Sequence, residues 1–186
     1  MKEANGSVRQ LTRKGVDYDP ALSCDEKSLV FVRRGPLQNR SSIDAEIGDR
    51  DGNELWIAAL SAPETPRKVF SGDQKQPEWF GLGNPRFSAD GQTLYFLRWF
   101  GNGSSLYELT TRTGATKRIV GSRGLWTVCE GAFKNGIVVQ EDHLKLAGGH
   151  IDLFWLYDGQ GRRIDLVGTD RADVAHFFGI RSDLLK

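Results

Sequence analysis

The sequence predicts an all-β fold in which a four-stranded antiparallel unit occurs three times. Glycine accounts for 22 of the 186 residues and aromatic residues for 10% of them. This composition favours short strands joined by tight turns over helices. An internal repeat is the second observation, because DPALSCDEKSLVFV at 19–32 aligns without gaps with NPRFSADGQTLYFL at 84–97. A weaker third copy is EGAFKNGIVVQ at 130–140, where Ala132 and Phe133 match Arg86 and Phe87.

Two further blocks follow each copy of the repeat. The first pairs an aliphatic with an aromatic residue, so that Leu55, Leu106 and Leu153 align, as do Trp56, Tyr107 and Phe154. The second is a short basic and apolar run: RKVF at 67–70, KRIV at 117–120 and RIDLV at 163–167. Each unit therefore contains the sequence of four short strands.

Four antiparallel strands in about 40–50 residues are typical of a propeller blade. A β-sandwich is the alternative, but it does not require one turn motif to recur with the same neighbours. The predicted blades span about 19–70, 84–120 and 130–168, and residues 8–12 form an extra strand. Residues 169–186 form a short helical tail, with Val174, Phe177, Phe178 and Leu184 on its apolar side.

The repeat resembles a known family. QLT at 10–12, the Asp-x-x-Pro-like start of the repeat, the S-x-D-G-x-x-L-x-F motif at 88–96 and the Leu-Tyr strand resemble the TolB-like β-propeller repeat. The same repeat occurs in the propeller domains of prolyl-oligopeptidase-type enzymes. The best match is at 84–120, and the resemblance extends over residues 8–168. It implies a partial, three-blade propeller and a periplasmic location in the bacterial envelope.

Charge and hydropathy exclude some classes of partner. Lys and Arg number 25 against 24 Asp and Glu, a formal net charge of +1, and no basic run is longer than a pair. This mixture disfavours a nucleic-acid partner. The longest apolar runs are too short to span a membrane. No signal peptide is visible at residues 1–7, so the alternative location is the cytoplasm.

The sequence contains no recognisable catalytic motif. Nucleophile-elbow, metalloprotease and phosphate-loop strings are missing, so we expect no catalytic residue and no cofactor. We interpret His143 and His150 as solvated turn residues rather than metal ligands. Cys24 and Cys129 are too few to define a disulfide framework, and we expect two free thiols.

Polar and aromatic residues gather in the segments that connect one predicted blade to the next. Asp19, Asn84 and Glu130 are predicted to be equivalent in register. The ligand-binding candidates are Asp19, Asn84, Glu130, Trp79, Trp126, Arg98 and Trp99. Convergent polar groups among aromatic side chains suit a peptide or a sugar. The alternative is that the aromatic residues pack between blades.

These features predict a non-catalytic module that binds a protein or a peptide. The alternative function is a carbohydrate-directed or peptidase-associated propeller, in which acids at the loop face serve recognition or acid/base chemistry. Three units are too few for a ring, because propellers need about four to eight blades. The chain could be part of a longer propeller, a homodimer could complete a six-bladed ring, or the tail could cover one end.

Overall fold

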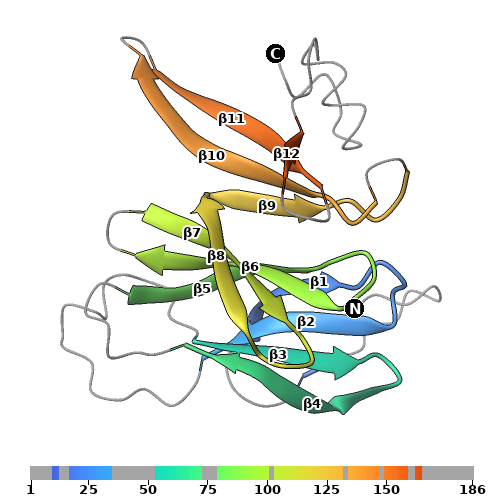
Figure 1. Ribbon diagram of the computed structural model, residues 1–186. Coiled ribbons are helices and arrows are strands. Elements are labelled where there is room, and N and C mark those ends of the chain that lie inside the picture. Colours follow the sequence, from blue (N-terminus) through green and yellow to red (C-terminus); the bar gives the residue numbers. More distant parts are fainter. Residues whose placement is uncertain are drawn as a thin grey trace, which may run out of the picture.

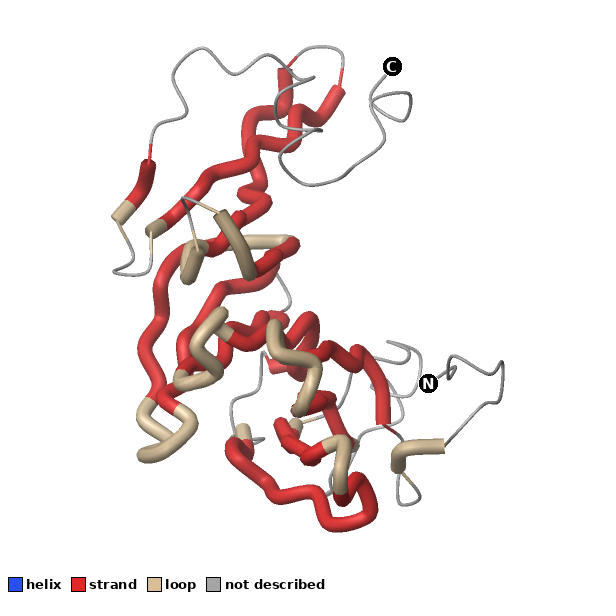
Figure 2. The backbone as a smooth tube through the Cα atoms, turned by 90° about the vertical axis from the view of Figure 1, so that its right-hand side faces the viewer, coloured by secondary structure: helices blue, strands red, loops and turns tan. Residues whose placement is uncertain are grey.

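The computed structural model of the chain describes residues 10–12, 17–34, 53–72, 79–100, 103–131, 134–146, 149–158 and 162–164. All regular elements in these ranges are β-strands, and none of the described residues is helical (Figure 2). The all-β prediction is confirmed. The predicted helical tail at 169–186 lies outside the described residues. Of the predicted extra strand at 8–12, residues 10–12 are described and are not part of a strand.

The strands form three four-stranded antiparallel sheets, as predicted. The first sheet contains β1 (Asp17–Leu22), β2 (Ser28–Arg33), β3 (Glu54–Ala59) and β4 (Ala62–Ser71). The second contains β5 (Trp79–Phe87), β6 (Thr93–Phe100), β7 (Gly103–Thr110) and β8 (Thr116–Gly121). The third contains β9 (Gly124–Thr127), β10 (Ile137–Leu146), β11 (Gly149–Tyr157) and β12 (Arg163–Ile164). In each sheet the strands lie side by side in chain order.

The sheets are stacked in the order of the sequence (Figure 1). In the second and third sheets, we call the face that packs on the preceding sheet the leading face, and the opposite face the trailing face. In the first sheet, the trailing face is the one that packs on the second sheet, and the leading face is the opposite one. The trailing face of the first sheet packs on the leading face of the second, and the trailing face of the second packs on the third. The first contact buries Val30, Val32, Leu55 and Ile57 against Leu94, Phe96 and Leu109. The second buries Tyr95, Leu97 and Leu106 against Leu125, Ile137, Val139 and Tyr157.

The first two sheets share a bulge in their first strand. The register with the second strand shifts between Tyr18 and Ala21 in β1 and between Gly83 and Arg86 in β5. Pro20 and Pro85 lie in these two bulges, where a residue without a backbone N–H leaves no ladder hydrogen bond unmade. The two prolines that align in sequence therefore have equivalent places in their sheets.

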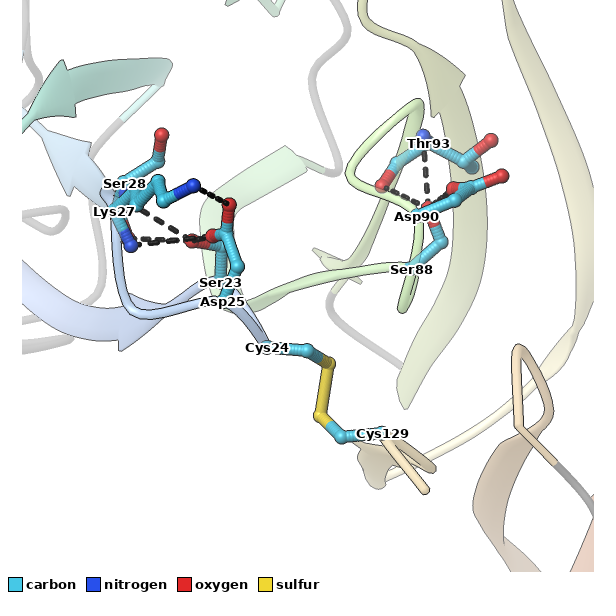
Figure 3. The surroundings of a disulfide bond; sticks show 9 residues. All are labelled: Ser23, Cys24, Asp25, Lys27, Ser28, Ser88, Asp90, Thr93 and Cys129. Atoms are coloured by element: carbon cyan, nitrogen blue, oxygen red, sulfur yellow. Dashed lines mark hydrogen bonds and ion pairs between the residues drawn. A yellow bond between two sulfur atoms is a disulfide. The ribbon is translucent and has the colours of Figure 1, made fainter. Parts of the chain in front are cut away.

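The recurrent Ser-x-Asp motif forms the turn between the first two strands. The Ser88 hydroxyl donates a 2.6 Å hydrogen bond to Asp90, and the Ser23 hydroxyl donates one of the same length to Asp25 (Figure 3). The Ser88 hydroxyl and then the Gln92 backbone N–H hold the pKa of Asp90 below its ordinary value. The serine and aspartate side chains of the motif find their hydrogen-bond partners within the turn that they close, so their role is structural.

The two cysteines are not free thiols. Cys24 and Cys129 form a disulfide whose Cα atoms are 5.5 Å apart and whose sequence separation is 105 residues (Figure 3). The bond joins the β1–β2 turn of the first sheet to the loop after β9 in the third. The prediction of two thiols was wrong because spacing in the sequence says nothing about which turns the stacked sheets bring together.

The third unit begins earlier than predicted. The backbone bond that closes the turn after the first strand runs from Ser88 N–H to the Thr93 carbonyl in the second sheet, and from Val128 N–H to the Gly136 carbonyl in the third. Its first strand is therefore β9, not a strand at Ala132 and Phe133, which lie outside the described residues. The sequence copy at 130–140 places this strand six residues too late.

Candidate binding surfaces

Asp19 and Asn84, two of the predicted ligand-binding residues, meet at the bulges of neighbouring sheets. The Asp19 carboxylate accepts a 3.0 Å hydrogen bond from the Asn84 backbone N–H. Both residues have left-handed backbone angles, with φ of 48° and 53°. Asparagine and aspartate tolerate this conformation better than other non-glycine residues. The predicted register equivalence of this pair agrees with the two bulges.

The contacts of Asp19 tie the first sheet to the second. A Cβ atom on Gly83 would lie 3.1 Å from the Asp19 carboxylate and 2.8 Å from Trp99 Nε1, so the backbone approaches both closely. The neighbouring Tyr18 hydroxyl donates to the Leu82 carbonyl at 3.1 Å. Burial lowers the pKa of Arg86, and the negative charge of Asp19 opposes that shift. Asp19 thus braces an inter-sheet contact, whatever else it binds.

Glu130 does not join Asp19 and Asn84. The turn bond of the third sheet makes Val128 the equivalent of Ser88, so the position four residues earlier, Gly124, is the equivalent of Asn84. Glu130 is exposed in the loop that follows β9, next to the disulfide. The predicted register equivalence of Glu130 is wrong, because the third unit has no bulge at Gly124 and its first strand ends before Glu130.

The aromatic and basic candidates of the second sheet lie on different surfaces. The Arg98 guanidinium is 5.0 Å from the centroid of the Tyr107 ring and 5.6 Å from that of Phe100, a stacking contact within its own sheet. Trp99 is partly buried against the cluster between the second and third sheets. Trp79 lies at the start of β5, opposite Phe100.

Trp126 is exposed on the trailing face of the third sheet, next to Phe154. The exposed fractions of the two side chains are 42% and 44%, and their ring centroids are 6.0 Å apart. Val138, which pairs with Trp126, and Leu156, two residues from Phe154, share this face and are buried. The two rings therefore form an exposed aromatic surface beside a buried aliphatic row.

The sheet register shows which positions of the other sheets correspond to Phe154. In each sheet, the carbonyl that accepts the turn bond marks the start of the second strand. The residues four positions after it are Val32, Leu97 and Gln140, which are therefore equivalent. Their partners on the third strands are Leu55, Leu106 and Phe154. Leu55 and Leu106 are completely buried by the next sheet, whereas Phe154 is 44% exposed. The sequence alignment of Leu153 with Leu55 was one residue off, which exchanges the two faces of the strand.

A cavity of about 540 Å³ lies beside the leading face of the first sheet. It is lined by Gln10, Leu11, Thr12, Arg33, Trp56, Ser61, Pro63, Glu64, Thr65 and Pro66. The Arg33 guanidinium is 4.6 Å from the Trp56 ring centroid and is paired with Asp17 through two hydrogen bonds of 2.6 and 2.8 Å. The lining of this cavity is mostly apolar and uncharged polar, with Arg33 and Glu64 as its charged residues.

A smaller cavity of about 360 Å³ lies between the second and third sheets, with Asp90, Tyr95, Lys134 and Asp158 among its lining residues. Asp158 accepts hydrogen bonds of 2.8 Å from the Arg162 N–H and Nε. Burial, followed by the charges of Glu108 and Asp90, raises the pKa of Tyr95 to about 12. A general acid needs a raised carboxyl pKa, whereas that of Asp90 is lowered. Neither cavity is lined by any of the seven predicted binding residues.

Other kinds of site have no support in the described part of the chain. It contains no group of three or more His, Cys, Asp or Glu side chains that could hold a metal ion. It also contains no helix of the length and apolarity needed to cross a membrane.

Comparison with known proteins supports the fold but gives no closer relationship. No protein-family model matches the sequence, and no curated protein matches it. Among solved structures, the putative TolB of Agrobacterium tumefaciens superposes with a TM-score of 0.53 and 15% identity over 83% of this chain. The fold is that of a partial TolB-like β-propeller. The acylaminoacyl peptidase of Pyrococcus horikoshii (TM-score 0.50, 13% identity, 80% of this chain) and the AtxE2 isopeptidase (0.50, 11%, 86%) are also similar.

The chain spans half the length of the putative TolB, 24% of the acylaminoacyl peptidase and 30% of the isopeptidase. The resemblance to the TolB-like repeat seen in the sequence is thus confirmed at the level of the fold. At this level of identity the likeness concerns the propeller alone and not an activity.

Sequence reasoning missed Phe154 and the large cavity. Phe154-Trp155 satisfies the pattern of an apolar residue followed by an aromatic one as well as Leu153-Phe154 does, so the alignment had a second solution. The turn signal KNG at 134–136, which lies directly before the apolar run of β10, could have set the correct register. The cavity had no signal in the sequence, because residues 10–12 and 61–66 line it together only after folding.

Proposed function

We propose that the chain is a non-catalytic TolB-like propeller module that binds a protein or peptide partner. The observation that carries this proposal is the exposed pair of Trp126 and Phe154, which projects from the trailing face of the third sheet. Large aromatic side chains supply much of the binding energy at protein interfaces. Exposed aromatic groups that adjoin a buried apolar row mark interaction sites on soluble proteins.

The polar candidates favour recognition over catalysis. Acid/base chemistry needs two carboxyl groups at one cavity with pKa values pushed apart. Asp19 is engaged with the Asn84 N–H, and Glu130 belongs to a different loop. Asp158 and Asp90, which do share a cavity, are respectively paired with Arg162 and held at a lowered pKa.

The bacterial envelope is the compartment that we propose. The Cys24–Cys129 disulfide supports it, because disulfides persist in oxidising compartments such as the periplasm and are rare in the cytosol. The TolB-like fold is consistent with this location but does not establish it.

The binding role is tested by selecting peptides from a displayed random library on the immobilised, disulfide-bonded chain. We expect aromatic or aliphatic peptides whose binding falls at least tenfold in the Trp126→Ala/Phe154→Ala variant. Gln92→Ala is the control, because Gln92 is exposed in the turn between β5 and β6 of the second sheet, away from both outer faces. If the selected peptides bind the double variant as well as the unchanged chain, or if only glycans bind on an array, the proposal is wrong.

A further inference from the structure

We propose that the partner of the trailing face of the third sheet is the leading face of the first sheet in a second copy of the chain. Two chains would then close a ring of six sheets through two identical junctions. This inference rests on the proposed binding role of the Trp126–Phe154 surface and identifies its partner.

The trailing face of the third sheet is equivalent to surfaces that the fold already covers. Phe154 occupies the register position of Leu55 and Leu106, each of which packs on the leading face of the following sheet. At both equivalent positions within the chain, the packing partner is therefore the leading face of a four-stranded propeller sheet. A leading face that packed on the third sheet would continue the same kind of interface.

The first sheet presents a leading face of the required composition. Its residues Leu29, Phe31 and Trp56 are the register equivalents of Leu94, Phe96 and Tyr107 in the second sheet. The equivalent residues of the third sheet are Ile137, Val139 and Trp155. Those of the second and third sheets receive the trailing face of the sheet before them.

The exposed large hydrophobic side chains of the described residues lie on these two faces. They are Leu22 at 45%, Trp126 at 42% and Phe154 at 44%. Leu22 pairs with Leu29, so it belongs to the leading face of the first sheet. Trp126 and Phe154 belong to the trailing face of the third. Among the described residues, the exposed large hydrophobic side chains thus lie on the two surfaces that a ring would bring together.

The leading face of the first sheet also has space for a side chain of the second copy. Leu11 packs against the buried cluster of Leu29, Phe31 and Ala58 without filling the space beside Trp56. The cavity of about 540 Å³ remains there, bounded by Trp56, Pro63 and Pro66. Arg33 lies over the Trp56 ring, and an aromatic side chain entering the cavity would meet this guanidinium as well.

Symmetry closes the arrangement at two copies. A head-to-tail contact forms a ring when its rotation closes and an open fibre when it does not. Three sheets from each chain give six, which is within the range of about four to eight in known propellers. The Cys24–Cys129 disulfide joins the first and third sheets of each chain and so limits how far the two ends can move apart.

The test is the mass of the disulfide-bonded chain in solution, measured by sedimentation over a dilution series. We expect a concentration-dependent species of twice the 20.7 kDa of one chain. Phe154→Glu on one face and Leu22→Glu on the other should each weaken association at least tenfold. Gln92→Glu, an exposed position in the second sheet, adds the same charge away from both faces and should associate like the unchanged chain.

Mixing the two variants distinguishes the ring from other dimers. The intact leading face of the Phe154→Glu chain can receive the intact trailing face of the Leu22→Glu chain, so the mixture should recover a two-chain species. A dimer of two identical trailing faces would survive Leu22→Glu and show no recovery on mixing, which would overturn the ring. A chain that stays monomeric at all concentrations would also overturn it. If such a monomer still bound peptides through Phe154, the proposed binding role would stand without the ring.

Discussion

The two outer faces of the stack differ in how the chain's own residues cover them. On the leading face of the first sheet, Leu11 packs over Leu29, Phe31 and Ala58, which are buried, and Arg33 lies over the rings of Phe31 and Trp56. On the trailing face of the third sheet, Trp126 and Phe154 remain exposed.

The difference shows which surfaces of the two end sheets remain open. Each sheet of a stack must cover two faces, and the end sheets have only one neighbour each. The chain covers most of one end with its own residues and leaves a cavity there. It offers a projecting pair of rings at the other end. The two ends are therefore different surfaces, one with a cavity and the other with an exposed pair of rings, rather than two equal patches.

The largest expected effect contrasts a covered with an open position of the same register. Leu106→Ala should destabilise the chain by about 2–5 kcal/mol, because it empties space between the second and third sheets. Phe154→Ala should change the free energy of unfolding by less than about 1 kcal/mol in dilute solution. Urea unfolding of both variants at low concentration measures the contrast. Equal losses would mean that Phe154 is buried and that the comparison fails.

The disulfide should have the next largest effect. Replacing Cys24 and Cys129 by serine should lower the free energy of unfolding by about 2–4 kcal/mol, since the bond closes a long loop of the unfolded chain. The measurement is the urea midpoint of the oxidised protein, the double variant and the protein in reductant. The last two should coincide. A double variant as stable as the oxidised protein would show that the bond does not hold the first and third sheets together.

The ion pair on the leading face of the first sheet should contribute less. Arg33→Met leaves the Asp17 carboxylate without its guanidinium and should cost about 1–3 kcal/mol. Lys68→Met is the matched control, because Lys68 pairs with Glu54 but its side chain is 46% exposed, and it should cost less than about 1 kcal/mol. Thermal unfolding compares the two. A larger loss of stability for Lys68→Met would show that Arg33 does not stabilise this face more than an exposed ion pair does.

The smallest effect concerns the turn between the first two strands of the second sheet. The pKa of Asp90 is lower in the folded chain than its ordinary value of 3.8. Its contribution is therefore complete above pH of about 4 and is lost as the pH falls through the lower folded pKa. Asp90→Asn should cost at most about 1 kcal/mol at pH 7, and progressively less as the pH falls below about 4. Stability curves for both proteins over this pH range provide the test, and a difference that grows toward low pH would contradict it.

The sequence predicted the parts of the fold that depend on local chemistry. Asp-Pro and Asn-Pro place bulges, and Ser-x-Asp closes turns, because these residue types satisfy backbone groups within a few positions. Pro20 and Pro85 therefore revealed the duplication, and the apolar runs that follow them form β2 and β6, each of which has four consecutive buried residues.

The third unit could not be placed by the same reasoning. It lacks the proline, the serine and the aspartate of the motif, so only its apolar pattern remained, and that pattern fits two registers one residue apart. Its first strand was placed six residues too late, and Glu130 was matched to Asn84 for that reason. The Cys24–Cys129 bond and the cavity beside Trp56 depend on how sheets stack, which local patterns do not encode.

The central claim is that Phe154 and Trp126 are exposed on the face of the third sheet that corresponds to the buried inter-sheet faces of the first two sheets. Hydroxyl-radical footprinting with mass spectrometry measures this directly, with the buried Leu106 as the internal reference. At the lowest concentration we expect strong labelling of Trp126 and Phe154 and weak labelling of Leu106, with the first two falling as the concentration rises. Labelling of Phe154 as weak as that of Leu106 in the most dilute sample would contradict the claim.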